Sequence, residues 1–135
     1  MAVFQDTQNL YDILGNFFTY LKDDPDIGPK VLASGLVLQF IYEEPDGIIY
    51  VDCPKNLIYL GAQAELKADV EMRMKSDVAH RFWLGKVNLM ISITKGEIKV
   101  KGPIPKIMKL LPVIKGAYEK YQNYLKGKGL ESMIA

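Results

Sequence analysis

The sequence of 135 residues has few of the side chains on which nucleophilic and metal chemistry depend. It contains one cysteine, Cys53, and one histidine, His80. A single cysteine cannot form a disulfide within the chain, so we expect a reducing, cytoplasmic location. One cysteine and one histidine cannot complete a zinc site, and no pattern places His80 beside Cys53 as a catalytic base. We therefore predict no metal, no cofactor and no catalytic residue.

Long apolar runs and targeting signals are also missing. No stretch approaches the roughly 18 consecutive apolar residues of a membrane-spanning helix. The first six residues carry no basic segment followed by an apolar core, so we expect no signal peptide. The length fits a single soluble domain over residues 1–135. Such a domain buries enough surface to fold without a disulfide or metal.

Arginine is scarce, and charge is unevenly distributed. The only arginines are Arg73 and Arg81, and aromatic side chains do not alternate with the lysines, so we expect no nucleic-acid partner. Residues 1–85 carry 7 Lys and Arg against 13 Asp and Glu, whereas residues 86–135 carry 10 Lys against 3 Glu. This Lys-rich C-terminal third allows transient contact with an anionic membrane surface. The plainer alternative is a solvated face of one helix and one strand.

The first half of the chain predicts helices followed by a β-hairpin. Asp6 or Thr7 caps a helix whose apolar residues recur at helical spacing until residues 23–24, ahead of Pro25. A short helix is expected over residues 30–34. Residues 36–53 predict a hairpin around a Pro-Asp-Gly turn, with one strand face formed by Leu36, Leu38, Phe40 and Tyr42. A third strand is expected over residues 57–62.

The second half predicts two further strands between helices. Residues 70–75 alternate, with Val70, Met72 and Met74 on the inner face, and a fifth strand carries Ile98 and Val100 inward. Ser76 is the expected cap of the helix that follows the fourth strand. Pro103 favours the start of the last helical region. Pro112 predicts either a kink in it or two abutting helices.

Adaptable apolar side chains are concentrated on the inward faces of these elements. Methionine is unbranched and polarizable, and it suits surfaces that accept more than one shape. The pattern alone allows either a plain hydrophobic core or a lipid-sized cavity. The predicted lining of that cavity consists of Phe40, Met72, Met74, Phe82, Trp83, Met90, Ile107, Met108, Leu111 and Ile114.

The order and spacing of several short motifs resemble the sterol carrier protein (SCP-like) sterol and lipid-transfer domain family. The matching features are the strand Val70-Glu71-Met72-Arg73-Met74, the helix start Ser76-Asp77, Leu84-Gly85-Lys86, Asn88-Leu89-Met90, the turn and strand from Lys95 to Gly102, and Leu110-Leu111. The upstream hairpin also fits, so the resemblance covers roughly residues 5–120. Pro103 and Pro112 depart from the family pattern, and both lie beside the predicted cavity.

The resemblance implies an α+β fold. Its five-stranded, mostly antiparallel sheet is covered by helices, with a hydrophobic cavity between them. It implies a soluble, non-catalytic carrier of a fatty acid, acyl-CoA, sterol or similar apolar ligand. Two alternatives remain: a regulatory or protein-interaction module with a filled core, and an accessory to a lipid-metabolising enzyme. A connected cavity of at least about 300 Å³ would distinguish a carrier from a filled module.

Overall fold

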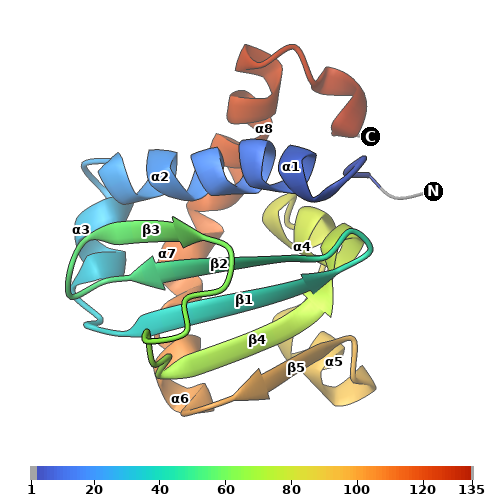
Figure 1. Ribbon diagram of the computed structural model, residues 1–135. Coiled ribbons are helices and arrows are strands. Elements are labelled where there is room, and N and C mark those ends of the chain that lie inside the picture. The colour runs from blue at the N-terminus through green and yellow to red at the C-terminus, as the bar shows by residue number, and fades with distance from the viewer. Residues whose placement is uncertain (1–2, 135) are drawn as a thin grey trace.

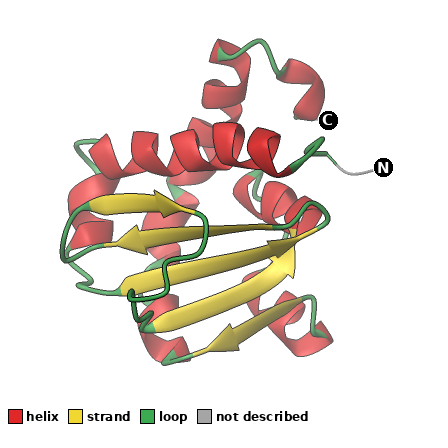
Figure 2. Cartoon of the chain, in the orientation of Figure 1, coloured by secondary structure: helices red, strands yellow, loops and turns green. Residues whose placement is uncertain are grey.

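Five strands form one mixed sheet, and most of the helices lie behind it (Figures 1 and 2). The computed structural model describes residues 3–134. The strands are β1 (Val37–Glu43), β2 (Gly47–Asp52), β3 (Leu57–Leu60), β4 (Val70–Lys75) and β5 (Ile98–Lys101), in the order β3-β2-β1-β4-β5. Neighbours are antiparallel except β1 and β4, which are parallel. The predicted α+β fold with a five-stranded, mostly antiparallel sheet is confirmed.

The connection from β3 to β4 crosses the face of the sheet that points away from the helices (Figure 1). Asp69, at its end, accepts a hydrogen bond from the Val37 amide at 2.8 Å and donates its own amide to the Val37 carbonyl at 2.8 Å. Tyr50 and Asp52 have side chains on this same face and are buried. The apolar face formed by Leu38, Phe40 and Tyr42 is therefore left for the helices.

The N-terminal helix is continuous and changes its hydrogen-bond pattern midway. It comprises α1 (Thr7–Leu10), a π-helical segment η1 (Tyr11–Gly15) and α2 (Asn16–Asp23). The Asp6 carboxylate accepts from the Asn9 amide at 2.8 Å, which confirms one of the two predicted caps.

Two predicted helix starts are wrong. The short helix α3 (Ile27–Leu32) begins earlier than residue 30, because the Asp24 carboxylate accepts from the Ile27 amide at 2.7 Å and closes the turn there. Ser76 does not cap α4 (Ser76–Trp83). β4 runs directly into this helix, and the Ser76 hydroxyl instead donates to the Pro45 carbonyl at 2.8 Å.

The remaining helices follow α4 and return across the back of the sheet. They are α5 (Leu89–Lys95), α6 (Ile104–Met108), α7 (Leu111–Lys115), α8 (Ala117–Gly127) and the 3-10 turn η2 (Glu131–Met133). Of the two outcomes predicted at Pro112, the structure has two abutting helices, α6 and α7. α7 contains no fully buried residue, whereas α8 buries Ala117, Tyr121 and Leu125.

Candidate functional site

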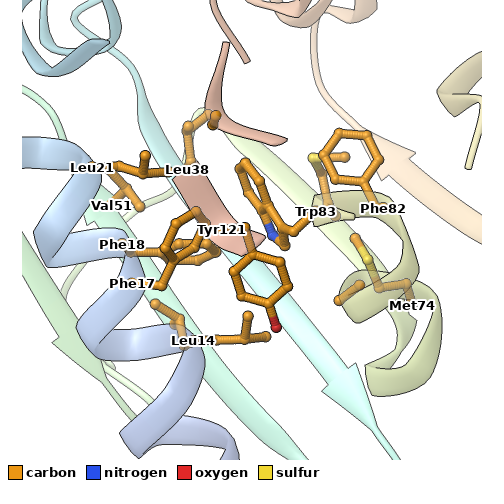
Figure 3. Close-up of a cluster of buried hydrophobic side chains, with 14 of the residues drawn as sticks. Leu14, Phe17, Phe18, Leu21, Leu38, Val51, Met74, Phe82, Trp83 and Tyr121 are labelled. Atoms are coloured by element: carbon orange, nitrogen blue, oxygen red, sulfur yellow. The ribbon is translucent and has the colours of Figure 1, made fainter. Parts of the chain in front are cut away.

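An aromatic cluster fills the space between the N-terminal helix, α4 and the sheet. Trp83, the last residue of α4, lies at its centre, with ring centroids 5.5 Å from Phe17, 5.5 Å from Phe18 and 5.2 Å from Phe82. Figure 3 shows Trp83 between Phe18 on one side and Phe82 on the other. Aromatic rings prefer edge-on arrangements of this kind when they pack together. The cluster divides the interior into two parts.

The larger cavity lies between α2, α3, the inner face of β1 and β2, and the region around α7. Its volume is about 70 Å³. Phe18 and Leu21 enter its wall from α2, Leu38 from β1 and Val51 from β2. Lys22 is the one charged residue in this wall, and its ammonium group lies 2.8 Å from the Asp23 carboxylate. Apart from Lys22, whose ammonium group is already paired, the residues of this wall are apolar.

The smaller cavity lies on the other side of the aromatic cluster, next to β4 and α4. Its volume is about 20 Å³, and its wall includes Met72, Met74, Tyr42, Phe82 and Ile98. Phe40 and Trp83 line both cavities. Rearranging these two rings would therefore connect them.

Nine of the ten predicted lining residues fall into four groups. Phe40 and Trp83 line both cavities, Met72, Met74 and Phe82 line the smaller one, and Ile114 lines the larger one. Ile107 is buried, and Met108 and Leu111 are half-buried against the core, but none of these three lines either cavity.

The placement of Met90 in the lining is wrong. Its side chain is 44% exposed on the surface of α5. Successive helical residues point about 100° apart, and the neighbouring Leu89 takes the buried position.

Sequence reasoning missed most of the wall supplied by the first half of the chain. Leu38 was predicted only to share a strand face with Phe40 and Tyr42, and Phe18, Leu21 and Val51 were not predicted to line a cavity. No local signal distinguishes a side chain that lines a cavity from one packed in a solid core. The place of Lys22 in this wall was also missed, because a lysine near a helix end normally indicates only solvent exposure.

A third hollow, of about 300 Å³, is polar and lies at the surface. Arg73, Lys75 and Lys99 line it together with Glu43 and Glu97. The Arg73 guanidinium lies 3.5 Å from the Glu43 carboxylate. Because five of its eight lining residues are charged, the hollow suits an apolar ligand less well than the two interior cavities do. Within residues 3–134, no group of three or more His, Cys, Asp or Glu side chains is placed to hold a metal ion.

His80 is a buried connector between α4, α8 and the C-terminal turn. A carbonyl oxygen can only accept, so His80 Nε2 carries the proton and donates to the Met133 carbonyl at 2.6 Å. His80 Nδ1 then accepts from the Tyr121 hydroxyl at 2.8 Å. Burial lowers the pKa of His80, outweighing the Met133 carbonyl and Asp77, which raise it, while Lys86 also lowers it.

This lowered pKa predicts that acid destabilises the protein. His80 has a lower pKa in the folded protein than in the unfolded chain, where it is about 6.5. Below about pH 6.5, the unfolded chain therefore binds more protons at His80 than the folded protein does. The stability from neutral His80 is complete above that pH and is lost as pH falls through the lower pKa of the folded state. We expect the melting temperature at pH 5.5 to be about 3 °C or more below that at pH 7.5. His80→Gln should be less stable at pH 7.5 and should lose most of this pH dependence; an equal dependence in both proteins would contradict the assignment.

The arrangement defines a class of protein: an α+β domain that encloses an apolar interior between a mixed sheet and helices. The family model for the SCP-2 sterol transfer family matches residues 17–115. The chain therefore belongs to this family, and the resemblance predicted from its motifs is confirmed. No curated protein matches the chain.

Several solved structures share this fold. The sterol carrier protein domain 2 of Helicoverpa armigera superposes with a TM-score of 0.66 at 14% identity, covering 88% of this chain and 94% of that one. Apo sterol carrier protein 2 from Yarrowia lipolytica gives 0.60 at 16% identity, covering 87% and 96%. Sterol carrier protein 2 from Aedes aegypti, solved with the C16 fatty acid palmitate, gives 0.53 at 15% identity, covering 84% and 96%. At these identities the similarity shows the fold.

No helix within residues 3–134 is both long and apolar enough to cross a membrane.

Proposed function

We propose that this protein is a non-catalytic lipid carrier that holds a fatty acid, acyl-CoA, sterol or similar apolar ligand between its sheet and helices. The observation that carries the proposal is the pair of apolar cavities on either side of Phe40 and Trp83. Membership of the SCP-2 sterol transfer family and the palmitate complex of the Aedes aegypti protein support it. Apolar burial supplies the affinity, at about 0.8 kcal/mol for each methylene.

A ligand must enlarge the interior in order to bind. The two cavities, of about 70 and 20 Å³, are far smaller than the roughly 300 Å³ or more of ordinary ligand pockets. α7 is the wall that is easiest to displace, since it has no fully buried residue and a break at residues 109–110, just ahead of Pro112, separates it from α6. Outward movement of α7 would carry Ile114 away from the larger cavity. This proposal assigns α7 the role of a lid.

The small cavities also favour the second candidate, an interaction or regulatory module with a filled core. Native mass spectrometry of the purified protein separates the two functions, because a carrier retains an endogenous lipid or binds added palmitate. Trp83 is the single tryptophan and lines both cavities, so its fluorescence should change on palmitate titration. If no lipid co-purifies and micromolar palmitate leaves the spectrum unchanged, the carrier function is rejected in favour of the module.

We further propose that the edge of the molecule formed by α5 and β5 touches anionic membranes during lipid exchange. Lys95, Lys99 and Lys101 lie on these two adjacent elements (Figure 1). Met90 and Ile91 are 44% and 53% exposed on the same helix. Apolar side chains flanked by lysines suit an interface of anionic headgroups and acyl chains.

The double substitution Met90→Glu and Ile91→Glu tests this contact. We expect it to weaken binding to vesicles containing phosphatidylserine by at least about tenfold, because it removes two apolar anchors and adds two like charges. Co-sedimentation measures the effect. The matched control is Lys126→Gln with Lys128→Gln on α8, which should bind nearly as the wild type does. Equal losses in both variants would indicate only a general charge effect and would refute a specific α5 contact.

The single-domain organisation and the cytoplasmic location remain proposals. One continuous cluster of buried side chains, drawn from the sheet and from helices at both ends of the chain, supports a single domain. The free thiol of Cys53 is buried, and burial raises its pKa, which disfavours the reactive thiolate. A structural thiol of this kind suits a reducing compartment.

A further inference from the structure

The Tyr42 hydroxyl is a buried polar group without a hydrogen-bond partner. Its residue is 2% exposed, and no atom within residues 3–134 bonds to its oxygen. Three other buried polar side chains have partners: the His80 ring bonds to Tyr121 and Met133, Ser76 donates to Pro45, and Asp52 accepts from the Lys55 amide. Buried polar groups are normally paired, because leaving one unpaired is costly. The exception at Tyr42 therefore requires an explanation.

Tyr42, whose hydroxyl is unpaired, lies at the proposed ligand site. Tyr42 follows Phe40 by two residues on the inner face of β1, and the two rings lie nearly parallel, with centroids 6.3 Å apart. Its side chain lines the smaller cavity together with Met72, Met74 and Trp83. Among the residues that line this cavity, Tyr42 is the only one that bears a hydroxyl group, and none has a charged side chain.

The protonation state of Tyr42 suits it to donate a hydrogen bond. Burial raises its pKa well above the usual value, so the hydroxyl keeps its proton throughout the physiological range. A neutral donor in an apolar wall favours a neutral acceptor oxygen. A carboxylate there would lose its hydration without gaining a cation, because no charged residue lines the smaller cavity.

We propose that the Tyr42 hydroxyl donates a hydrogen bond to a neutral hydroxyl or carbonyl oxygen at the buried end of the carried lipid. The proposal rests on the carrier function and refines its ligand class to apolar molecules with one neutral oxygen at the leading end. That oxygen enters the smaller cavity, and the apolar body passes Phe40 and Trp83 into the larger one. Tyr42 thereby determines both which ligands bind and in which orientation.

The isosteric variant Tyr42→Phe tests this role, because it should raise the stability of the empty protein but weaken its binding of a ligand with a hydroxyl group. Removing an unpaired buried hydroxyl should stabilise the empty protein and raise its melting temperature by about 2–5 °C. The same change should weaken binding of decan-1-ol about 5- to 10-fold and leave binding of decane unchanged. Trp83 fluorescence reports both titrations.

Tyr59→Phe is the matched control, because Tyr59 lies on β3 and does not line either cavity. It should bind both probes as the wild type does. A lower melting temperature for empty Tyr42→Phe would show that the hydroxyl is paired without ligand and would overturn the proposal. Equal effects of Tyr42→Phe on decan-1-ol and decane would also overturn it, while leaving the carrier function intact. If the wild type binds neither probe and also fails to bind palmitate, both proposals fall together.

Discussion

Val51→Phe is expected to weaken palmitate binding by about 100-fold while the protein remains folded. Val51 lies on the inner face of β2 and lines the larger cavity. A phenyl ring there would occupy the space that the ligand chain needs. Excluding about four methylenes at about 0.8 kcal/mol each removes about 3 kcal/mol of binding free energy, which corresponds to roughly 100-fold. Titration of Trp83 fluorescence with palmitate measures the change.

The control for this substitution is Ile58→Phe. Ile58 pairs with Val51 across β2 and β3, so both positions share a face of the sheet, but Ile58 lines neither cavity. It should bind palmitate within about threefold of the wild type. Circular dichroism and thermal unfolding of Val51→Phe should show a native fold, because the added ring enters existing space. Unchanged palmitate binding by folded Val51→Phe would place the ligand outside the larger cavity.

Gly102→Ala is expected to destabilise the folded protein strongly, although it adds only one methyl group. Gly102 follows β5 with a φ of 122°, a conformation that L-residues rarely adopt. A Cβ there would lie 2.6 Å from the Asp69 carbonyl oxygen and 3.2 Å from the Val70 Cα, both of which are backbone atoms. Backbone strain and this clash together should cost about 3–5 kcal/mol, lowering the melting temperature by about 10 °C or more.

Gly61→Ala separates the strain from the clash. Gly61 has a φ of 95°, and a Cβ there would have no heavy atom within 4 Å. It should therefore lose only the strain contribution, about 1–2 kcal/mol. Thermal and urea unfolding of both variants provide the comparison. Equal destabilisation would show that contact with Asp69 and Val70 adds nothing.

The faces of the strands could be predicted from local patterns. Alternation with a period of two assigned Phe40, Met72 and Met74 to the inner face, and all three line a cavity. Helical periodicity failed for Met90, because residues 89–93 of this short helix are apolar nearly throughout and do not favour one face. The predicted cap at Ser76 was wrong for another reason. Serine prefers helix caps locally, but in the folded chain the Pro45 carbonyl lies nearby and accepts its hydrogen bond.

The membership of the family and the lid proposal also began with sequence features. The order of short motifs from Val70 to Leu111 is a linear property, so it can be compared between chains without a structure. Pro112 likewise predicted an interruption, since proline lacks the amide that a helix requires. The structure added that α7 buries no residue fully, a property of its neighbours rather than of its own sequence.

Element order, strand faces and helix breaks follow from sequence alone in this protein, because they depend on residues a few positions apart. The division of the interior by Phe40 and Trp83, the place of Lys22 in a cavity wall and the unpaired hydroxyl of Tyr42 emerge only in the tertiary structure. These features depend on contacts between distant segments, as when His80 bonds to a carbonyl 53 residues further along the chain. A local pattern can place a side chain inside, but only packing determines whether it meets another atom or an empty space.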